Sequence, residues 1–308
     1  MCTYNGEKYI REQIDTILAQ TYPILELIIQ DDGSSDSTPS ICREYAAKYP
    51  NVLFFQNGEN LGYNENFRTA CLKAHGDFIA ISDQDDVWLK EKIEMQVNMI
   101  GTNDLCYSDN MVGTSQGNSR YRHRRGNQFA VLFYCPLGHT FLMPRSFAQD
   151  PANWSGFRDY DWSLAVHANL QHGSVGIEKA LVWHRRHQNS ATSNVLSTLK
   201  VKQNNKLMPY INGYACYKLI FSSKDHQEFY HSIHEATSSE RFKTVHQMSY
   251  LLLHPSFCSW IRLGMLCAKY RRLIYEDPSK VRGLGGLLRG FFFISIYSYW
   301  SIYHPSSK

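Results

Sequence analysis

Long apolar runs, a strong net charge and closely paired cysteines are all missing from this chain of 308 residues. No stretch of 18 uncharged apolar residues occurs, which argues against a membrane-spanning helix. The formal net charge is only +4 and dispersed, so nucleic acid is not an expected partner. None of the eight cysteines stands at C-x-x-C spacing, which argues against a structural zinc site and a disulfide framework. Buried thiols in a reducing compartment are expected, and we therefore predict a cytoplasmic protein.

The first hundred residues alternate helix and strand patterns. Helices are predicted at Tyr9–Ala19, after Ser37, at Glu65–His75 and at Val87–Ile100, and strands at Leu25–Gln30, Val52–Phe55 and Phe78–Ser82. This βαβα order indicates an α/β fold with a parallel, doubly wound sheet.

The mixed pattern continues to about residue 190 and then changes. Strands are predicted at Leu105–Ser108, Thr140–Met143 and Ile177–His184, and a helix at Asp161–Gln171. Beyond residue 191 the chain reads as helices and loops rich in Tyr, Phe and Leu. We therefore predict an α/β domain over residues 1–190 and a helical region over residues 191–308.

Acidic residues follow the strands of the predicted sheet. Asp31 and Asp32 come directly after one strand, and Asp83, Asp85 and Asp86 after another. Open α/β sheets bind ligands beyond the carboxyl ends of their strands. Carboxylates that converge there repel one another unless a cation is present. The pattern therefore predicts a site for a cation or a cationic group at this edge.

Several motifs together resemble the family 2 glycosyltransferases of the GT-A fold. They are Cys2-Thr3-Tyr4-Asn5-Gly6, Asp31-Asp32-Gly33-Ser34-Ser35-Asp36, Asn60-Leu61-Gly62, Gly76-Asp77 and Asp83-Gln84-Asp85-Asp86-Val87-Trp88. Their order and spacing fit over residues 2–190. The resemblance implies a mixed, mainly parallel sheet flanked by helices, with a helical, aromatic-rich C-terminal extension. The Asp161-Trp162 region and a late Arg-x-His-like stretch look closest to bacterial rhamnosyltransferase-like members.

That resemblance implies a nucleotide-diphosphate-sugar donor and a divalent cation, Mn²⁺ or Mg²⁺. Such a cation neutralises the charge that develops on the leaving diphosphate. By analogy Asp85 is the first choice of metal ligand, and Asp83 is expected to touch the ribose or a metal-bound water. The alternative for Asp86 is to cap the helix predicted from Val87.

The donor nucleotide is expected in the pocket of the first loops. Asp31 and Asp32 are candidates for hydrogen bonds to the nucleobase and ribose, and Thr3 and Tyr4 line the same pocket. Ordinary turn chemistry is the alternative reading of the aspartate pair, because Asp-Gly-Ser is a common turn sequence.

Sugar transfer with inversion needs a base beside the acceptor hydroxyl. Asp161 resembles the family's catalytic aspartate, with Asp159 as the competing choice and helix capping as the alternative for both. Gly138-His139-Thr140 resembles the family segment that lies beside the donor sugar, and His139 is expected to be structural. His184, Arg185 and His187 are candidates for diphosphate or metal contacts, and plain surface charge is the alternative.

The resulting hypothesis is a glycosyltransferase that adds a hexose or deoxyhexose to a glycan or lipid-linked acceptor in cell-surface polysaccharide synthesis. The alternatives are an inactive nucleotide-sugar-binding or scaffolding subunit and a nucleotidyltransferase. The latter should have a Gly-rich basic loop after its first strand, which is not present.

Two further expectations concern the ends of the chain. Only Met1-Cys2 precede the Thr-Tyr-Asn-Gly loop, so most of the first strand is expected to be missing, which would either expose a sheet edge or open a gap near the nucleotide pocket. Leu284–Tyr303 is rich in Leu, Phe, Tyr and Trp and follows Lys280 and Arg282. We expect this segment to contact the surface of the cytoplasmic face of the membrane, with packing on the catalytic domain or a dimer contact as the alternative.

Overall fold

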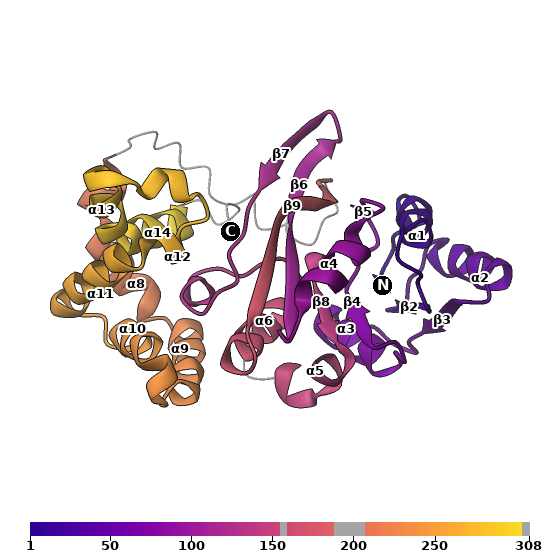
Figure 1. The fold of residues 1–308 in the computed structure, drawn as a ribbon, viewed down its shortest axis with the longest axis horizontal. Coiled ribbons are helices and arrows are strands. Elements are labelled where there is room, and N and C mark those ends of the chain that lie inside the picture. Colours follow the sequence, from indigo (N-terminus) through magenta and orange to yellow (C-terminus); the bar gives the residue numbers. More distant parts are fainter. Residues whose placement is uncertain (155–158, 188–206, 304–308) are drawn as a thin grey trace. The chain divides into compact units, whose positions relative to one another are not determined.

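The computed structural model describes residues 1–154, 159–187 and 207–303, which fall into two units (Figure 1). The first unit holds the described residues up to Gly126 and from Cys135 to Arg186. The second unit holds Asn127–Tyr134 and the described residues from His187 onward. The segment Asn127–Tyr134 therefore belongs with the helical unit although it lies inside the α/β sequence.

Three parallel strands form one sheet of the first unit, in the order β1 (Cys2–Thr3), β2 (Leu27–Asp31), β3 (Val52–Gln56). The helices between and after them are α1 (Ile10–Leu18), α2 (Thr38–Lys48) and α3 (Tyr63–Leu72). All five residues of β2 are buried, as expected for a strand covered on both faces. The βαβα pattern thus predicted this half of the unit correctly.

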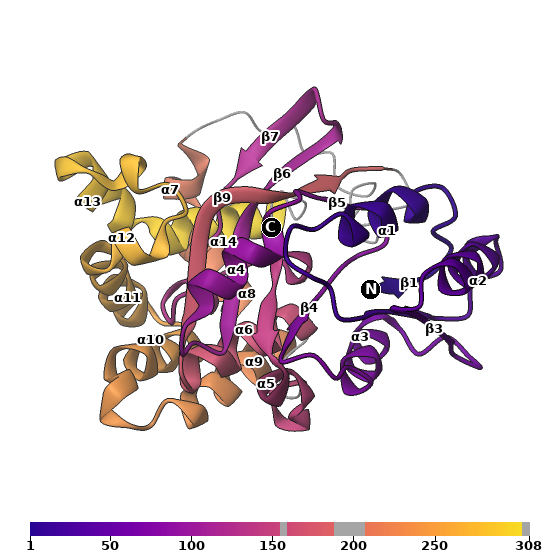
Figure 2. The same cartoon turned by 45° about the vertical axis from the view of Figure 1, so that its right-hand side comes forward.

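The other strands form a second sheet, visible in the centre of Figure 2. Its order is β4 (Phe78–Ala80), β8 (Leu142–Pro144), β6 (Leu105–Ser115), β9 (Ser174–Arg185), β5 (Val87–Trp88), with β7 (Asn118–Arg122) on β6. Only β6 and β9 run parallel here, and the other pairs are antiparallel. The helices of this part are α4 (Lys92–Ile100), α5 (Arg145–Gln149) and α6 (Tyr160–Leu170). The predicted α/β class is confirmed, but β4 joins an antiparallel partner and does not extend the first parallel sheet.

The helix predicted from Val87 begins at Lys92. Val87 and Trp88 instead pair with Trp183 and Val182 of β9. Trp88 is buried in the core shared with Leu181 and Val182, so burial of its side chain favours the strand over an earlier helix start. The alternative that Asp86 caps a helix starting at Val87 is therefore wrong, because Asp86 precedes a strand.

A cavity of about 380 Å³ lies between the two sheets of the first unit. Its lining is mostly apolar and comes from both sheets, α1 and α3, including Ile17, Leu27, Phe67, Ile79 and Leu142. The cavity reaches Ser82 but none of the acidic residues that follow it. The two sheets are linked beside it by one backbone hydrogen bond, from Cys2 N to Ser82 O (3.2 Å).

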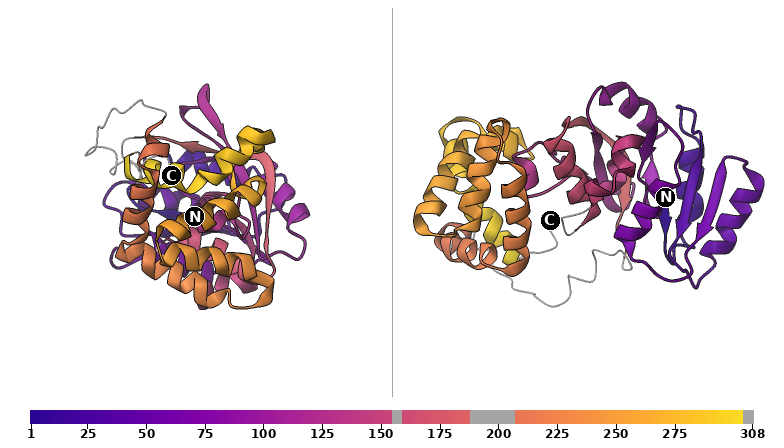
Figure 3. Two further views of the ribbon diagram at one scale, coloured as in Figure 1. Left: turned by 90° about the vertical axis from the view of Figure 1, so that its left-hand side faces the viewer. Right: turned by 90° about the horizontal axis from the view of Figure 1, so that it is seen from below.

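The second unit is helical throughout its described part (Figure 3). Its α-helices are α7 (Met208–Ile211), α8 (Gly213–Phe221), α9 (Lys224–Ala236), α10 (Lys243–Leu253), α11 (Phe257–Lys269), α12 (Arg271–Ile274), α13 (Gly283–Phe291) and α14 (Phe293–Tyr303). Phe133 of the inserted segment packs edge-on against Phe293, and Tyr230 donates a hydrogen bond to Leu132 O (2.5 Å). Among the described residues no helix combines the length and apolar character needed to cross a membrane.

Candidate active site

The acidic loop Asp83–Asp86 connects β4 to β5 and is held by the first loop of the chain. The Gln84 carboxamide accepts a hydrogen bond from Tyr4 N and donates one to Tyr4 O, each at 2.9 Å. The same carboxamide packs against the Cα of Gly6, where a Cβ would lie 2.1 Å from Gln84 Oε1. The loop that carries the predicted metal ligand is thus fixed to the loop predicted to hold the nucleotide.

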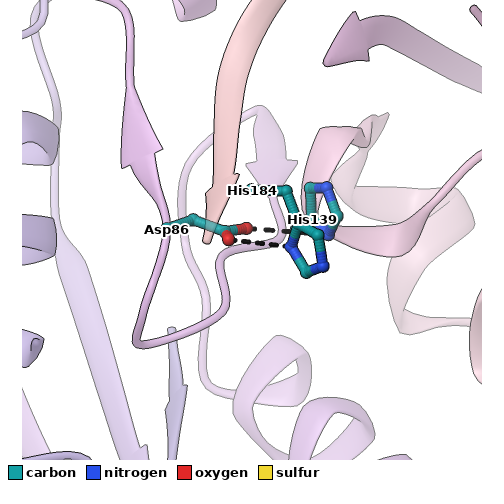
Figure 4. A group of neighbouring side chains, drawn as sticks. All are labelled: Asp86, His139 and His184. Atoms are coloured by element: carbon teal, nitrogen blue, oxygen red, sulfur yellow. Dashed lines mark hydrogen bonds and ion pairs between the residues drawn. The ribbon is translucent and has the colours of Figure 1, made fainter. Parts of the chain in front are cut away.

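Asp86 lies beside two stacked histidine side chains and interacts with both (Figure 4). Its Oδ1 is 3.0 Å from Nδ1 of His184, and its Oδ2 is 3.6 Å from Nδ1 of His139. The two imidazole rings stack with centroids 4.7 Å apart. Asp86 is fully buried and its Oδ2 has no hydrogen bond. One carboxylate and two imidazoles this close, with an orphaned oxygen, fit a divalent transition-metal ion.

The charges of this cluster balance one another. Burial opposes charging of His139, but the carboxylates of Asp86, Asp83 and Asp85 outweigh it and raise the pKa of His139 to about 9. Burial likewise opposes charging of Asp86, yet the two histidines hold its pKa below the usual range. His139 Nδ1 also lies 3.4 Å from Asp83 Oδ2. Without a metal, a protonated His139 therefore supplies positive charge that the acidic loop needs.

The predicted donor residues Asp31 and Asp32 both hold loops together. Asp31 accepts hydrogen bonds from Thr3 Oγ1 (2.8 Å) and from the backbone and side chain of Ser34. Asp32 accepts from the backbone N–H groups of Leu61 and Gly62, at 2.8 and 2.9 Å. These bonds agree with the turn-chemistry reading, and donor binding by the pair stays a prediction. Tyr4, which was also predicted to line the nucleotide pocket, is half exposed.

Asp161 lies in the first turn of α6, where the charges of Asp83 and His139 act on its carboxyl group. Burial, together with the charges of Asp159 and Asp83, raises the pKa of Asp161 to about 7. The preceding Tyr160 packs so tightly on the backbone before His139 that a Cβ at Gly138 would lie 2.1 Å from its hydroxyl. A carboxylate with a pKa near neutrality suits proton transfer at pH 7.

The competing candidate, Asp159, accepts a hydrogen bond from the Tyr63 hydroxyl at 2.5 Å. No side-chain hydrogen bond caps α6 from this residue. Its carboxylate is therefore held by α3, whereas the Asp161 carboxylate accepts a hydrogen bond from the neighbouring Trp162 N (2.8 Å) and interacts with the Cys135 thiol.

Arg185 supports the acidic loop from β9. Its Nε donates to Asp85 O (3.0 Å), its Nη2 pairs with Glu12, and the guanidinium lies 4.5 Å from the ring centroids of both Tyr9 and Trp183. These contacts place the Arg185 guanidinium beside Asp85, and its contact with a diphosphate stays a prediction. His187 belongs to the second unit, and its predicted role is likewise untested.

Gln84 was predicted only as part of the acidic motif, and His139 was expected to be structural. The structure brings His139 and His184 to Asp86 although 45 positions separate the two histidines in the printed sequence. No fixed spacing connects residues on separate strands and turns, so only the Gly138-His139-Thr140 resemblance could have drawn attention to His139.

The fold and the acidic loop can now be compared with known proteins. The model of the family "Glycosyl transferase family 2" matches residues 1–164, which is more than half of the chain. The chain therefore belongs to glycosyltransferase family 2. It is a glycosyltransferase that uses a nucleotide-sugar donor.

Two relatives are named as sugar transferases, and a solved structure shares the fold. A dTDP-rhamnosyl transferase, RfbG, of Shigella flexneri is 29% identical over 62% of this chain and 72% of its own length. The Escherichia coli enzyme WfgD, a UDP-Glc:alpha-D-GlcNAc-diphosphoundecaprenol beta-1,3-glucosyltransferase, is 36% identical over 35% of this chain and 42% of its own. In fold the chain resembles TarS 1–349 of S. aureus, solved also with UDP-GlcNAc, at a TM-score of 0.53. That match has 17% identity and covers 97% of this chain and 89% of TarS 1–349.

Proposed function

We propose that this glycosyltransferase is metal-dependent and inverting, and that it adds a hexose or deoxyhexose to a glycan or lipid-linked acceptor in cell-surface polysaccharide synthesis. The observation that carries the proposal is the concentration of carboxylates and imidazoles around Asp83–Asp86, with Asp161 close by. The names of the two sugar transferases above, one of which acts on a diphosphoundecaprenol substrate, support the choice of acceptor.

The cation, Mn²⁺ or Mg²⁺, would neutralise charge on the diphosphate that leaves the donor. Asp85 is the first choice of ligand because it is only half-buried, so a diphosphate can approach a cation bound to it. The group Asp86, His139 and His184 is the second choice. A cation there is deeper in the protein and requires His139 to give up its proton.

Asp161 is the proposed base. As the acceptor hydroxyl attacks the sugar carbon, its proton passes to a carboxylate oxygen of Asp161. Thr3, Tyr4, Asp31, Asp32 and Asp83 are proposed to hold the nucleotide and ribose, and Arg185, His184 and His187 to complete the diphosphate or metal contacts. A peripheral contact with the cytoplasmic face of the membrane would bring a lipid-linked acceptor to the enzyme.

The decisive experiment incubates the purified protein with a panel of nucleotide sugars, with and without Mn²⁺, and measures donor hydrolysis and transfer. Turnover that an excess of chelator abolishes supports the proposal, and the configuration of the new bond tests inversion. Full turnover in excess chelator would contradict the metal requirement. Binding of a donor without any turnover would favour an inactive nucleotide-sugar-binding subunit.

A further inference from the structure

Helix α13 packs through its glycines and exposes its leucines. Gly286 and Gly290 are buried, and a Cβ at Gly290 would lie 2.9 Å from Ala268 Cα of α11. On the facing helix a Cβ at Gly264 would lie 2.8 Å from Phe291 O. Gly264 and Gly290 allow the backbones of α11 and α13 to approach closely, and larger residues there would force the helices apart, while Gly286 lies against the backbone of Val281.

The opposite face of α13 carries Leu284, Leu287 and Leu288, which lie three and four positions apart and so share one side of the helix. Leu284 is 74% exposed and Leu288 55%. In an ordinary surface helix of a globular protein the leucines face the core and small or polar residues face water. In α13 the glycines are buried and the leucines are exposed, so the apolar face of this helix is left open to water within the described part of the chain.

Positive charge surrounds these leucines. Lys280, Arg282 and Arg289 are all exposed, and no aspartate or glutamate occurs from residue 278 to residue 308. The nearest acid before that stretch, Asp277, lies 3.5 Å from Lys280, and both side chains are substantially exposed. Exposed pairs of this kind contribute little, so Lys280 stays available to another anion.

We propose that the Leu284–Leu287–Leu288 face of α13, flanked by Lys280, Arg282 and Arg289, docks on an anionic lipid surface. A short helix with apolar residues on one side and cations beside them lies in the plane of the interface without crossing it. Negative lipid headgroups attract the cations, and the leucines enter the boundary of the acyl chains. A lipid surface agrees with the lipid-linked acceptor of the proposed function, and in this respect the inference rests on the proposed function. Phe293, Ile294 and Tyr299 of α14 are buried, so these three residues do not belong to this surface.

The test is flotation of the full chain with vesicles of phosphatidylglycerol and phosphatidylcholine, compared with phosphatidylcholine alone. We expect binding to the anionic vesicles only, and a loss of roughly a hundredfold for Leu284→Gln/Leu288→Gln, at about tenfold per leucine. Leu219→Gln on α8 is the matched control, because Leu219 is 67% exposed in the same unit and is predicted not to touch lipid. Arg282→Gln/Arg289→Gln should remove the preference for anionic lipid.

Two results would overturn the proposal. One is wild-type protein that does not float with the anionic vesicles, and the other is a leucine double variant that floats like the wild type. Sedimentation of the same variants adds a third: if the leucine changes only turn a dimer into a monomer, the face is a protein interface. Flotation measures no sugar transfer, so donor turnover that persists in a protein without lipid binding would leave the proposed activity intact.

Discussion

The side chain of Gln84 occupies the space that a side chain at Gly6 would need. Its Oε1 would lie 2.1 Å from a Cβ at Gly6, and its two hydrogen bonds to the Tyr4 backbone hold it there. Because the residues on either side of Gln84 are Asp83 and Asp85, this contact sets the position of the acidic loop against the predicted nucleotide loop.

The first prediction follows from this contact. Gln84→Ala removes two hydrogen bonds worth about 1 kcal/mol each, so we expect KM for the nucleotide sugar to rise roughly tenfold or more, with a smaller change in kcat. Gly6→Ala should act in the same way by displacing Gln84, and the double variant should be no worse than Gln84→Ala alone. Steady-state kinetics of the three variants measure this. Gln116→Ala, in the exposed turn between β6 and β7, is the control. Additive effects of the two changes would contradict the coupling.

A second prediction separates the two proposed sets of metal ligands. Asp85→Ala should lower Mn²⁺-dependent turnover by roughly a hundredfold or more, since the cation contributes several kcal/mol to transfer. Titration of Mn²⁺ by electron paramagnetic resonance measures binding directly. Weakened binding in Asp85→Ala but not in His184→Ala supports Asp85. The reverse result would move the cation to Asp86, His139 and His184.

The third prediction concerns proton linkage at His139. Because its pKa of about 9 exceeds the ordinary value of 6.5, His139 stabilises the metal-free fold below pH 6.5, and this contribution is lost as pH rises through 9. The metal-free melting temperature should therefore fall from pH 6.5 to pH 9. If the ion binds His139, Mn²⁺ displaces its proton and should raise the melting temperature more at pH 9 than at pH 7. His139→Gln should lose this difference. A Mn²⁺ effect equal at both pH values would place the cation away from His139.

The fourth prediction tests Asp161. Asp161→Asn keeps the shape but cannot accept a proton, so kcat should fall by roughly 10² to 10⁴ while the affinity for donor stays near normal. In the wild type, kcat should rise with pH through about 7 as the carboxylate loses its proton. Asp159→Asn is the matched control with a smaller expected effect. If Asp159→Asn had the larger effect, Asp159 would be the base.

The same substitution gives a fifth prediction, on stability. The folded-state pKa of Asp161 is raised, so the native state is favoured at low pH and loses stability as pH rises from about 4 to above 7. Asp161→Asn should therefore raise the melting temperature at pH 8 and leave it unchanged near pH 4. An equal change at both pH values would mean that the stability effect has another cause.

The sequence alone was sufficient for the fold class and the family, because both depend on local order. The apolar run at Leu27–Ile29, followed after Gln30 by two acids, indicates a buried parallel strand, and the motifs around Asp31 and Asp83 occur in the order found in the family. Propensity failed at Val87, where pairing with β9 and burial of Trp88 decided in favour of a strand.

Tertiary structure alone decided which side chains meet. Asp86, His139 and His184 come from a loop, a 3-10 turn and a strand, and only the register of β5 on β9 brings the first and last within 3.0 Å. The sequence indicated a surface contact for Leu284–Tyr303, but it did not show which side chains of α13 are exposed. Gly290 lies against Ala268 of α11 and Gly286 lies against the backbone of Val281, so the glycine side of α13 faces the protein and the leucine side is exposed, because two backbones approach closely only where no side chain separates them.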